Sequence, residues 1–273
     1  MKNIAAFLLI LFIVSCANGK EKTYVASTPA GVVVRSFLGI PLIDSVDFIR
    51  WKLVLHDNRY ELSCNYGIGK PNTNGFVNGG AKIELSDGVK KEKNYYHLQN
   101  GSKTLKIAGL NEDLLHLLNE DNSLLGGNGG WSYTLNSVMA SVTDQISIIP
   151  QQTVLKDSIV FEGRSPCGVP GIIAPGKECY KLKWLIVLYS NAEKNEPATY
   201  KVRGTPWHKE GGRRGNWKIV KEKNGRIIYQ LNDDNGNGFL YLLKLDEHVL
   251  VFTDANGKLL VGDEDFSYTL NSR

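Results

Sequence analysis

The hexapeptide Ser132-Tyr133-Thr134-Leu135-Asn136-Ser137 occurs a second time as Ser267-Tyr268-Thr269-Leu270-Asn271-Ser272, 135 positions further along the chain. Slightly upstream, at the same offset, Leu124-Leu125 matches Leu259-Leu260. Self-similarity at a fixed offset is the signature of a duplicated structural unit. The chain therefore contains the same unit twice.

A second matched block lies nearer the start of each copy. Trp51-Lys52-Leu53-Val54-Leu55 aligns with Trp184-Leu185-Ile186-Val187-Leu188 at an offset of 133. A turn of different length in the two copies explains the small change of offset between the blocks. We expect two homologous repeats at 23–138 and 155–273, joined by a linker at 139–154.

Each repeat consists of short segments in which apolar and polar residues alternate, separated by turn residues. Such alternation is typical of strands with one buried face, and regularly spaced short strands indicate an antiparallel sandwich or barrel. Lys223-Asn224-Gly225 predicts a hairpin, and Asn-Gly favours a type I′ turn. Only 31–38 and 112–118 leave helix and strand both open. Because closure removes exposed strand edges, we expect an all-β chain of two tandem antiparallel β-barrels.

The amino terminus has the features of an export signal. Lys2 precedes an apolar run at 4–14, which is shorter than the roughly 20 residues of a bilayer-spanning helix. Ile13-Val14-Ser15-Cys16 follows and resembles the bacterial lipobox, in which the cysteine thiol carries diacylglycerol and cleavage occurs before that cysteine. We expect a signal peptide at 1–15, a lipidated Cys16 holding the chain on a membrane, and a tether at 16–22. An ordinary secretory peptide with a chance cysteine is the alternative.

Export implies an oxidising compartment in which disulfides persist. Cys167 and Cys179 flank a loop rich in glycine and proline, which packs poorly by itself. We expect these two cysteines to form a disulfide. Cys64 lies in an alternating stretch, where a lone buried thiol is the usual arrangement.

The second repeat resembles a known family of envelope proteins. Phe161-Glu162-Gly163-Arg164-Ser165-Pro166-Cys167, followed by Gly171-Ile172, is similar to the opening of NlpE-type lipoproteins, and Gly215-Asn216-Trp217-Lys218-Ile219 is similar to a later strand of that family. The resemblance implies a small lipocalin-like barrel on a lipid anchor, most often at the outer membrane, in proteins linked to copper tolerance and surface sensing. Pro170 stands where the family has its second cysteine, so the Cys-x-x-Cys motif is missing. The resemblance thus implies architecture and location, but no copper chemistry.

Composition and motifs argue against several functional classes. The 32 basic and 28 acidic side chains give a net charge of +4, too small an excess for a dedicated nucleic-acid binder. The five histidines are scattered, with no two at metal-ligand spacing in one segment. Gly-x-Ser-x-Gly, His-Glu-x-x-His and phosphate-cradling glycine loops are missing from the sequence. We therefore expect no catalytic residue, metal or cofactor.

One basic, glycine-rich stretch leaves two interpretations open. A solvated hairpin tip is the simpler one, and contact with anionic headgroups or glycans is the alternative. Its cationic residues are Lys201, Arg203, Lys209, Arg213 and Arg214.

The tryptophans are the best candidates for a ligand site. Trp51 and Trp184 recur at matching positions, as residues of a barrel core would, whereas Trp207 and Trp217 have no clear partner in the first copy. The candidate ligand-binding residues are Trp184, Trp207 and Trp217.

We expect a non-enzymatic envelope lipoprotein that binds a small apolar ligand or acts in envelope homeostasis or sensing. The alternatives are a subunit that docks an envelope protein partner through its barrel faces and, as the weakest, an envelope hydrolase. An open lumen would favour a ligand carrier, and a filled lumen would favour docking.

Overall fold

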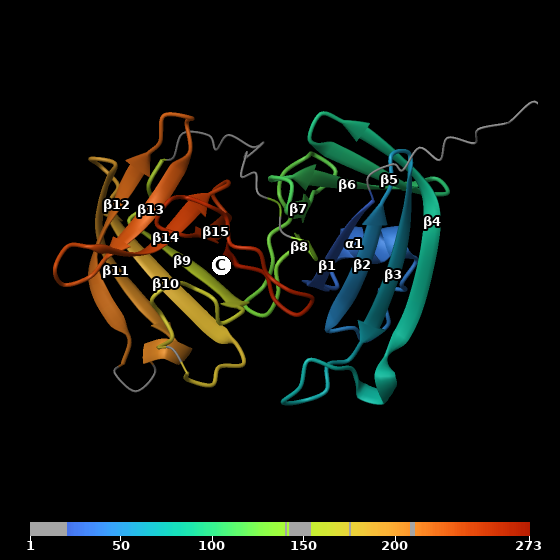
Figure 1. Ribbon diagram of the computed structural model, residues 1–273, viewed down its shortest axis with the longest axis horizontal. Helices are drawn as coiled ribbons and strands as arrows, with labels where there is room; N and C mark the ends of the chain where they lie inside the picture. Colours follow the sequence, from blue (N-terminus) through green and yellow to red (C-terminus); the bar gives the residue numbers. More distant parts are fainter. Residues whose placement is uncertain (1–20, 140, 142–153, 175, 208–210) are drawn as a thin grey trace, which may run out of the picture.

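The computed structural model describes residues 21–139, 141, 154–174, 176–207 and 211–273, and contains two closed eight-stranded antiparallel barrels (Figure 1). The expected signal peptide, Cys16 and most of the linker lie outside the described residues. The first barrel comprises β1 (Lys22–Pro29), β2 (Phe48–Leu55), β3 (Arg59–Gly67), β4 (Ala81–Glu92), β5 (Tyr95–Asn100), β6 (Lys103–Gly109), β7 (Leu114–Leu117) and β8 (Thr134–Ser137). The second comprises β9 (Ser158–Ser165), β10 (Leu182–Asn191), β11 (Glu196–Gly204), β12 (Arg213–Lys221), β13 (Ile227–Asn232), β14 (Gly238–Lys244), β15 (Val249–Thr253) and β16 (Thr269–Ser272).

Each strand pairs with the next along the chain, and the last pairs with the first. This up-and-down order confirms the all-β, two-barrel expectation. Of the two segments left open, 31–38 contains the helix α1 (Val32–Leu38), whereas 112–118 contains strand β7.

The alternation in the sequence sorts side chains between the barrel interior and the outside. In β10, Leu182, Trp184, Ile186 and Leu188 are buried, and the residues between them are partly or fully exposed. Eight strands enclose an interior just wide enough for side chains to fill. Both interiors are filled in this way. The largest fully buried side chains include Trp51, Tyr24, Tyr60 and Leu62 in the first barrel and Phe161, Tyr200 and Phe252 in the second.

The recurring tryptophans occupy equivalent positions in the two interiors. The indole N–H of Trp51 donates to the Thr28 hydroxyl at 2.8 Å, and that of Trp184 donates to the Ser165 hydroxyl at 2.8 Å. Both hydroxyls immediately precede a proline. This repeated bond satisfies a buried indole N–H that would otherwise be costly.

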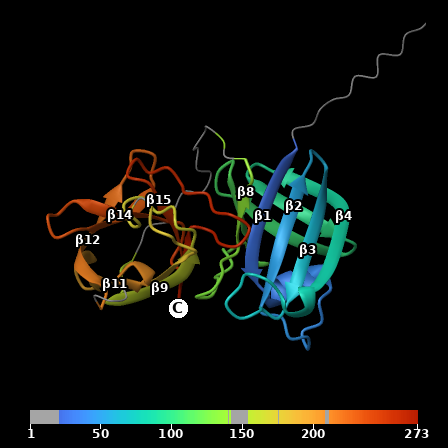
Figure 2. The ribbon, with the colours of Figure 1, turned by 60° about the horizontal axis from the view of Figure 1, so that its bottom comes forward.

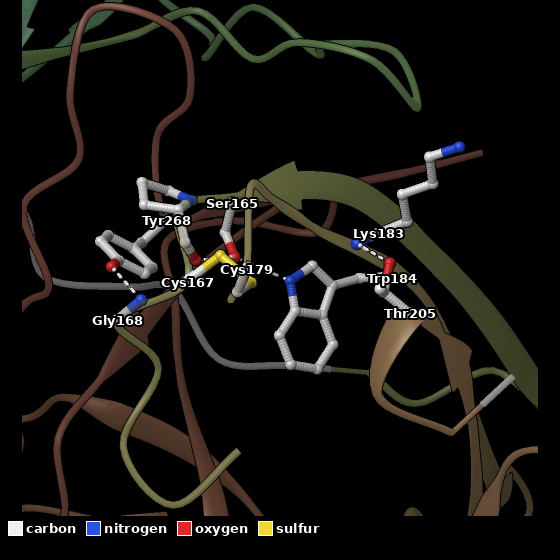
Figure 3. Close-up of a disulfide and its surroundings, with 9 residues drawn as sticks. Ser165, Cys167, Gly168, Cys179, Lys183, Trp184, Thr205 and Tyr268 are labelled. Carbon is white, nitrogen blue, oxygen red and sulfur yellow. Dashed lines mark hydrogen bonds between the residues drawn. A yellow bond between two sulfur atoms is a disulfide. The ribbon is translucent and has the colours of Figure 1, made fainter. Parts of the chain in front are cut away.

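We call the end of each barrel reached by the last residue of β1 or β9 its mouth. Helix α1 covers the mouth of the first barrel and buries Val34, Phe37 and Leu38. In the second barrel a loop at 166–181 takes this place, and Cys167 and Cys179 are disulfide-bonded within it (Figure 3). The short 3-10 helix η2 (Thr205–Trp207) lies beside it. Cys64 is free and buried, and burial raises the pKa of its thiol.

The hairpin at Lys223-Asn224-Gly225 is present, but the type I′ expectation is wrong. Gly225 has φ of 85°, while Asn224 is absent from the positive-φ residues of the described chain. The N–H of Gly225 donates to the carbonyl of Glu222, and the N–H of Glu222 donates to the carbonyl of Arg226. This is a three-residue loop in which glycine alone takes the left-handed conformation.

The two copies of the hexapeptide pack against each other. The hydroxyl oxygens of Ser132 and Ser267 are 2.6 Å apart, and those of Thr134 and Thr269 are 3.0 Å apart. Figures 1 and 2 show the loop after β15 reaching the first barrel from the second.

Further bonds across this contact are reciprocal. The Asn271 side-chain oxygen accepts from the N–H of Gly127 at 2.8 Å, and the Asn136 side-chain oxygen accepts from the N–H of Gly262 at 2.9 Å. Residues at equivalent positions of the two repeats contact each other, as they do in a two-fold symmetric interface, but here within one chain. A shared apolar cluster extends the contact, with Leu110 and Leu114 from the first barrel and six residues from the second: Ile228, Leu243, Leu245, Val249, Val251 and Leu259.

Candidate functional site

The two mouths open on the same side of the molecule, with a groove of about 480 Å³ between them. The first barrel contributes residues at the start of β2 and after β3, and the second contributes residues at the start of β10. The lining is formed by Ser27, Asp47, Phe48, Arg50, Gly69, Lys70, Asn72, Thr73, Asn74, Trp131, Arg164, Tyr180, Lys181, Lys183 and Asp265.

Both carboxylates that line the groove, Asp265 and Asp47, have hydrogen-bond or salt-bridge partners within the protein. Asp265 forms a salt bridge with Arg50 and accepts a hydrogen bond from the side-chain amide of Asn74 at 2.6 Å. Asp47 accepts a bond from the N–H of Gly69 at 2.7 Å. These contacts join the loop after β3 to the loop before β16, so one wall of the groove bridges both barrels.

Three further cations form what we call the positive wall of the groove, and in the described part of the chain none of them has a salt bridge to a carboxylate. Arg164 and Lys183 are direct cross-strand neighbours on β9 and β10, and Lys181 lies two residues before Lys183. Burial lowers the pKa of the Lys181 amine, the charges of Arg164 and Lys183 lower it further, and the charge of Asp265 partly opposes this shift. These three charges make the wall positive, and the repulsion between the neighbouring Arg164 and Lys183 is unfavourable.

Aromatic rings support the positive wall. Phe76, Phe48 and Trp131 form a stack with centroid separations of 4.2 and 4.7 Å. The guanidinium carbon of Arg164 lies 5.4 Å from the centroid of the Trp131 ring, and the Lys181 amine lies 5.3 Å from that of the Phe266 ring. Cation–π contacts of this kind position the charged groups without neutralising them.

A second cavity of about 670 Å³ lies at the mouth of the second barrel. Trp207 contributes an aromatic face to its largely apolar lining, and Lys181 and Lys183 belong to both this pocket and the groove. Trp207 is held by edge-to-face contacts with Trp184 at 6.2 Å and with Phe239 at 6.1 Å. An apolar pocket next to a cationic groove can accommodate both halves of an amphiphile.

The three tryptophans singled out in the sequence lie in different environments. Trp207 lines the pocket, whereas Trp184 and Trp217 are each only 3% exposed and belong to the barrel core. The indole N–H of Trp217 donates to the carbonyl of Tyr189, near the end of β10 remote from the mouth. The pocket thus joins Trp207 to Arg203 of the basic stretch and to Lys181 and Lys183, which no sequence pattern marks.

The basic stretch divides between the two sides of the sheet. Lys201 and Arg214 are cross-strand neighbours on the outside of the second barrel. Arg203 lies on the same outer face and lines the Trp207 pocket. Arg213 instead places its guanidinium carbon 4.2 Å from the centroid of the Phe239 ring. Lys209 lies outside the described residues.

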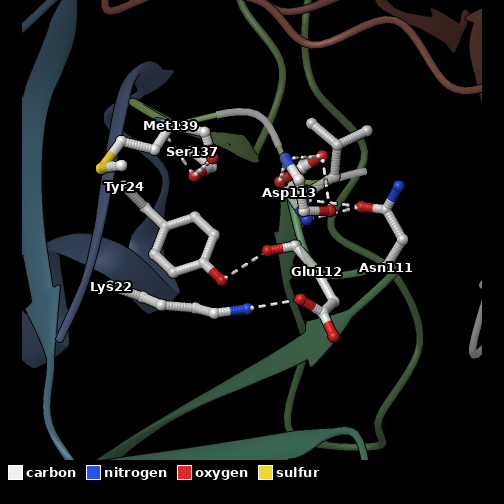
Figure 4. Close-up of polar contacts among 9 residues, drawn as sticks. Lys22, Tyr24, Asn111, Glu112, Asp113, Ser137 and Met139 are labelled. Carbon is white, nitrogen blue, oxygen red and sulfur yellow. Dashed lines mark hydrogen bonds and ion pairs between the residues drawn. The ribbon is translucent and has the colours of Figure 1, made fainter. Parts of the chain in front are cut away.

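At the opposite end of the first barrel, β1 begins and β8 ends, and both segments are hydrogen-bonded there. Lys22, which begins β1, pairs with the Glu112 carboxylate at 3.1 Å, and the Tyr24 hydroxyl donates to the Glu112 carbonyl (Figure 4). The Asp113 carboxylate accepts hydrogen bonds from the backbone N–H and the hydroxyl of Ser141, in the expected linker. The tether and the linker therefore both join the molecule at the end away from the mouths.

Within the described ranges, His, Cys, Asp and Glu side chains do not gather in groups of three or more that could hold a metal ion. Among the helices of the described residues, none has the length and apolar character needed to cross a membrane. Comparisons of the chain with protein-family models, with curated proteins and with solved structures gave no match.

Proposed function

We propose that this chain is a lipid-anchored protein of the bacterial envelope, with the outer membrane as its site, that binds a small apolar ligand and catalyses no reaction. The observation that carries the proposal is the pocket of about 670 Å³ beside Trp207, at the mouth of the second barrel. The pocket lies on the side facing away from Lys22, the point where the tether joins. A ligand site in this place remains open to the surroundings when the tether is held at a membrane.

Both interiors are filled, which by the criterion given above favours docking and leaves a ligand no space in either lumen. The ligand site of this proposal is therefore the pocket at the mouth. Trp184 and Phe252 pack together at a centroid distance of 4.9 Å directly behind Trp207. A ligand can therefore contact the exposed part of Trp207 without displacing the core. Lipocalin-like architecture and the lipobox-like Ile13-Val14-Ser15-Cys16 support the same proposal, because anchored barrels of this kind bring a binding site to a membrane surface.

The anchor is tested by cell fractionation of Cys16→Ala. We expect the variant in the soluble fraction, because acyl chains on Cys16 would supply about 0.8 kcal/mol of membrane binding per buried CH₂. A Cys64→Ala variant provides the control for loss of a cysteine. Retention of Cys16→Ala in the membrane fraction would contradict the anchor.

Ligand binding is tested by native mass spectrometry of the protein purified from a bacterial periplasm. We expect an additional mass that disappears on denaturation and that Trp207→Ala greatly reduces. Tyr189→Ala is the matched control, since Tyr189 is an exposed aromatic on the same barrel, remote from the pocket. A bare polypeptide mass, lower by two hydrogens for the Cys167–Cys179 disulfide, would contradict ligand binding.

A second candidate function is docking of an envelope protein partner, favoured by apolar residues at the mouth of the first barrel. Ile43 is 94% exposed and Leu42 is 61% exposed, both in the loop after α1, and Ile68 and Val77 are exposed nearby in the loop after β3. Clustered apolar exposure of this kind is typical of interaction surfaces. A bare mass together with loss of a co-purifying partner in Ile43→Ser would favour docking over ligand binding.

A further inference from the structure

The groove between the barrels carries positive charge that the protein does not neutralise. Five cations and two carboxylates line it, so the lining has a net charge of +3. Both carboxylates already have partners. Asp265 contacts Arg50 and Asn74, whereas Asp47 accepts a hydrogen bond from the N–H of Gly69. Four cations of the lining form no salt bridge within the described residues: Lys70, Arg164, Lys181 and Lys183. The Asp47 charge offsets one of them, which leaves the surplus of +3.

The arrangement of these cations is unfavourable without an anion. Arg164 and Lys183 occupy directly paired positions of adjacent strands, where like charges destabilise a sheet. Lys181 is partly buried beside both of them. Trp131 and Phe266 hold the Arg164 and Lys181 side chains by their ring faces, so these two charges are positioned before any ligand arrives. A site with prepositioned charges loses little conformational entropy on binding.

We propose that this groove binds a phosphate group. A phosphate monoester carries a charge of about −1.5 to −2, which matches the surplus of the groove far better than the single charge of a carboxylate. Arg164 supplies the planar guanidinium that suits two phosphate oxygens, while Lys181 and Lys183 act as point charges. At about 480 Å³ the groove has the volume of a site for a small molecule.

Two kinds of molecule carry a phosphate group that would suit this site. The phosphate belongs either to a soluble phosphorylated molecule or to the headgroup of an amphiphile whose acyl chain lies in the Trp207 pocket, which shares Lys181 and Lys183 with the groove. Arg164 and Lys70 line the groove but not the Trp207 pocket, so the phosphate site stands whether or not the pocket is occupied.

The test is calorimetric titration of the purified full chain with four related compounds: glycerol, glycerol 3-phosphate, a monoacylglycerol, and the corresponding acylglycerol 3-phosphate below its micelle concentration. We expect binding of at least one phosphate compound, with the affinity lowered about tenfold, or roughly 1.4 kcal/mol, in Lys183→Glu. Lys218→Glu is the matched control, because Lys218 is an exposed lysine of the same barrel outside the groove.

The four compounds separate the outcomes. Binding of glycerol 3-phosphate that weakens in Lys183→Glu establishes a soluble source, and binding of the acylated phosphate alone, with the same weakening, establishes a lipid headgroup. Equal binding of monoacylglycerol and its phosphate, unchanged in Lys183→Glu, overturns the phosphate site while leaving the apolar pocket intact. No binding of either phosphate compound, or equal weakening in Lys218→Glu, also overturns the proposal.

Discussion

The two barrels share a core but differ at their mouths. Trp51 bonds to Thr28 as Trp184 bonds to Ser165, with the same 2.8 Å separation in each barrel. At the mouth, the first barrel has the helix α1, whose apolar face completes the core, whereas the second has a disulfide-bonded loop. The last residue of this loop, Lys181, lines the Trp207 pocket. The duplicated unit thus retained the contacts that close a barrel, while the end loops diverged.

The barrels also differ at their mutual interface. His116 of the first barrel is fully buried and occupies the position equivalent to Val251 of the second. Its Nδ1 lies 2.9 Å from the Thr134 hydroxyl, which in turn contacts the Thr269 hydroxyl across the interface. Burial lowers the pKa of His116 to about 4. His116 therefore places an ionisable group where the equivalent position of the other barrel is apolar.

The shared core predicts the largest effects. Trp51→Ala and Trp184→Ala should each lower the free energy of unfolding by about 3–5 kcal/mol, because each leaves a cavity and removes a buried hydrogen bond. Chemical denaturation followed by circular dichroism measures the loss, with the partly exposed Trp207→Ala as a milder control. We expect a single transition, since the apolar cluster joins the barrels. Separate transitions, with one barrel still folded, would show that the two are energetically independent.

The buried histidine predicts a pH dependence. The folded pKa of about 4 lies below the ordinary value of 6.5, so the unfolded chain binds more protons between these values. This contribution to stability is fully present above pH 6.5 and is lost as the pH falls through 4, by about 3 kcal/mol in total.

Denaturation series between pH 7.5 and 4.5 measure this loss. His116→Val, which copies the equivalent Val251, should remove this part of the pH dependence, while the exposed His248→Val should retain it. An unchanged pH profile in His116→Val would assign the acid sensitivity to other groups.

The disulfide predicts a smaller effect that is confined to the second barrel. The double variant Cys167→Ser, Cys179→Ser should lose about 2–3 kcal/mol of stability, the chain-entropy value for so short a loop. Reductant should destabilise the wild-type protein by a similar amount and leave the double variant unaffected. Cys64→Ser controls for loss of the buried thiol. If reductant weakens the double variant as well, the effect does not arise from this disulfide.

Sequence reasoning was successful where local pattern decides the outcome. Alternation in β10 identified its buried positions, and the glycine and proline content at 168–176 pointed to the Cys167–Cys179 bond. The site is a different case. Ligand binding by Trp184, Trp207 and Trp217 stays a prediction, with Trp184 and Trp217 buried in the core and Trp207 lining a pocket, and no sequence pattern marks the cations of the groove. Arg50 and Asp265 are far apart along the chain and in different repeats, so no local pattern connects them.

By itself, the sequence determined the duplication, the all-β character, the barrel architecture and the core position of Trp51 and Trp184. These properties follow from the period of two in each strand and from the repetition of that pattern. Only the tertiary structure decided that the Ser132–Ser137 and Ser267–Ser272 segments meet, that both mouths open on one side, and that a cationic groove lies between them. A strand pattern specifies which of its faces is buried, but the choice of neighbour for the outer face depends on packing between residues far apart in the chain.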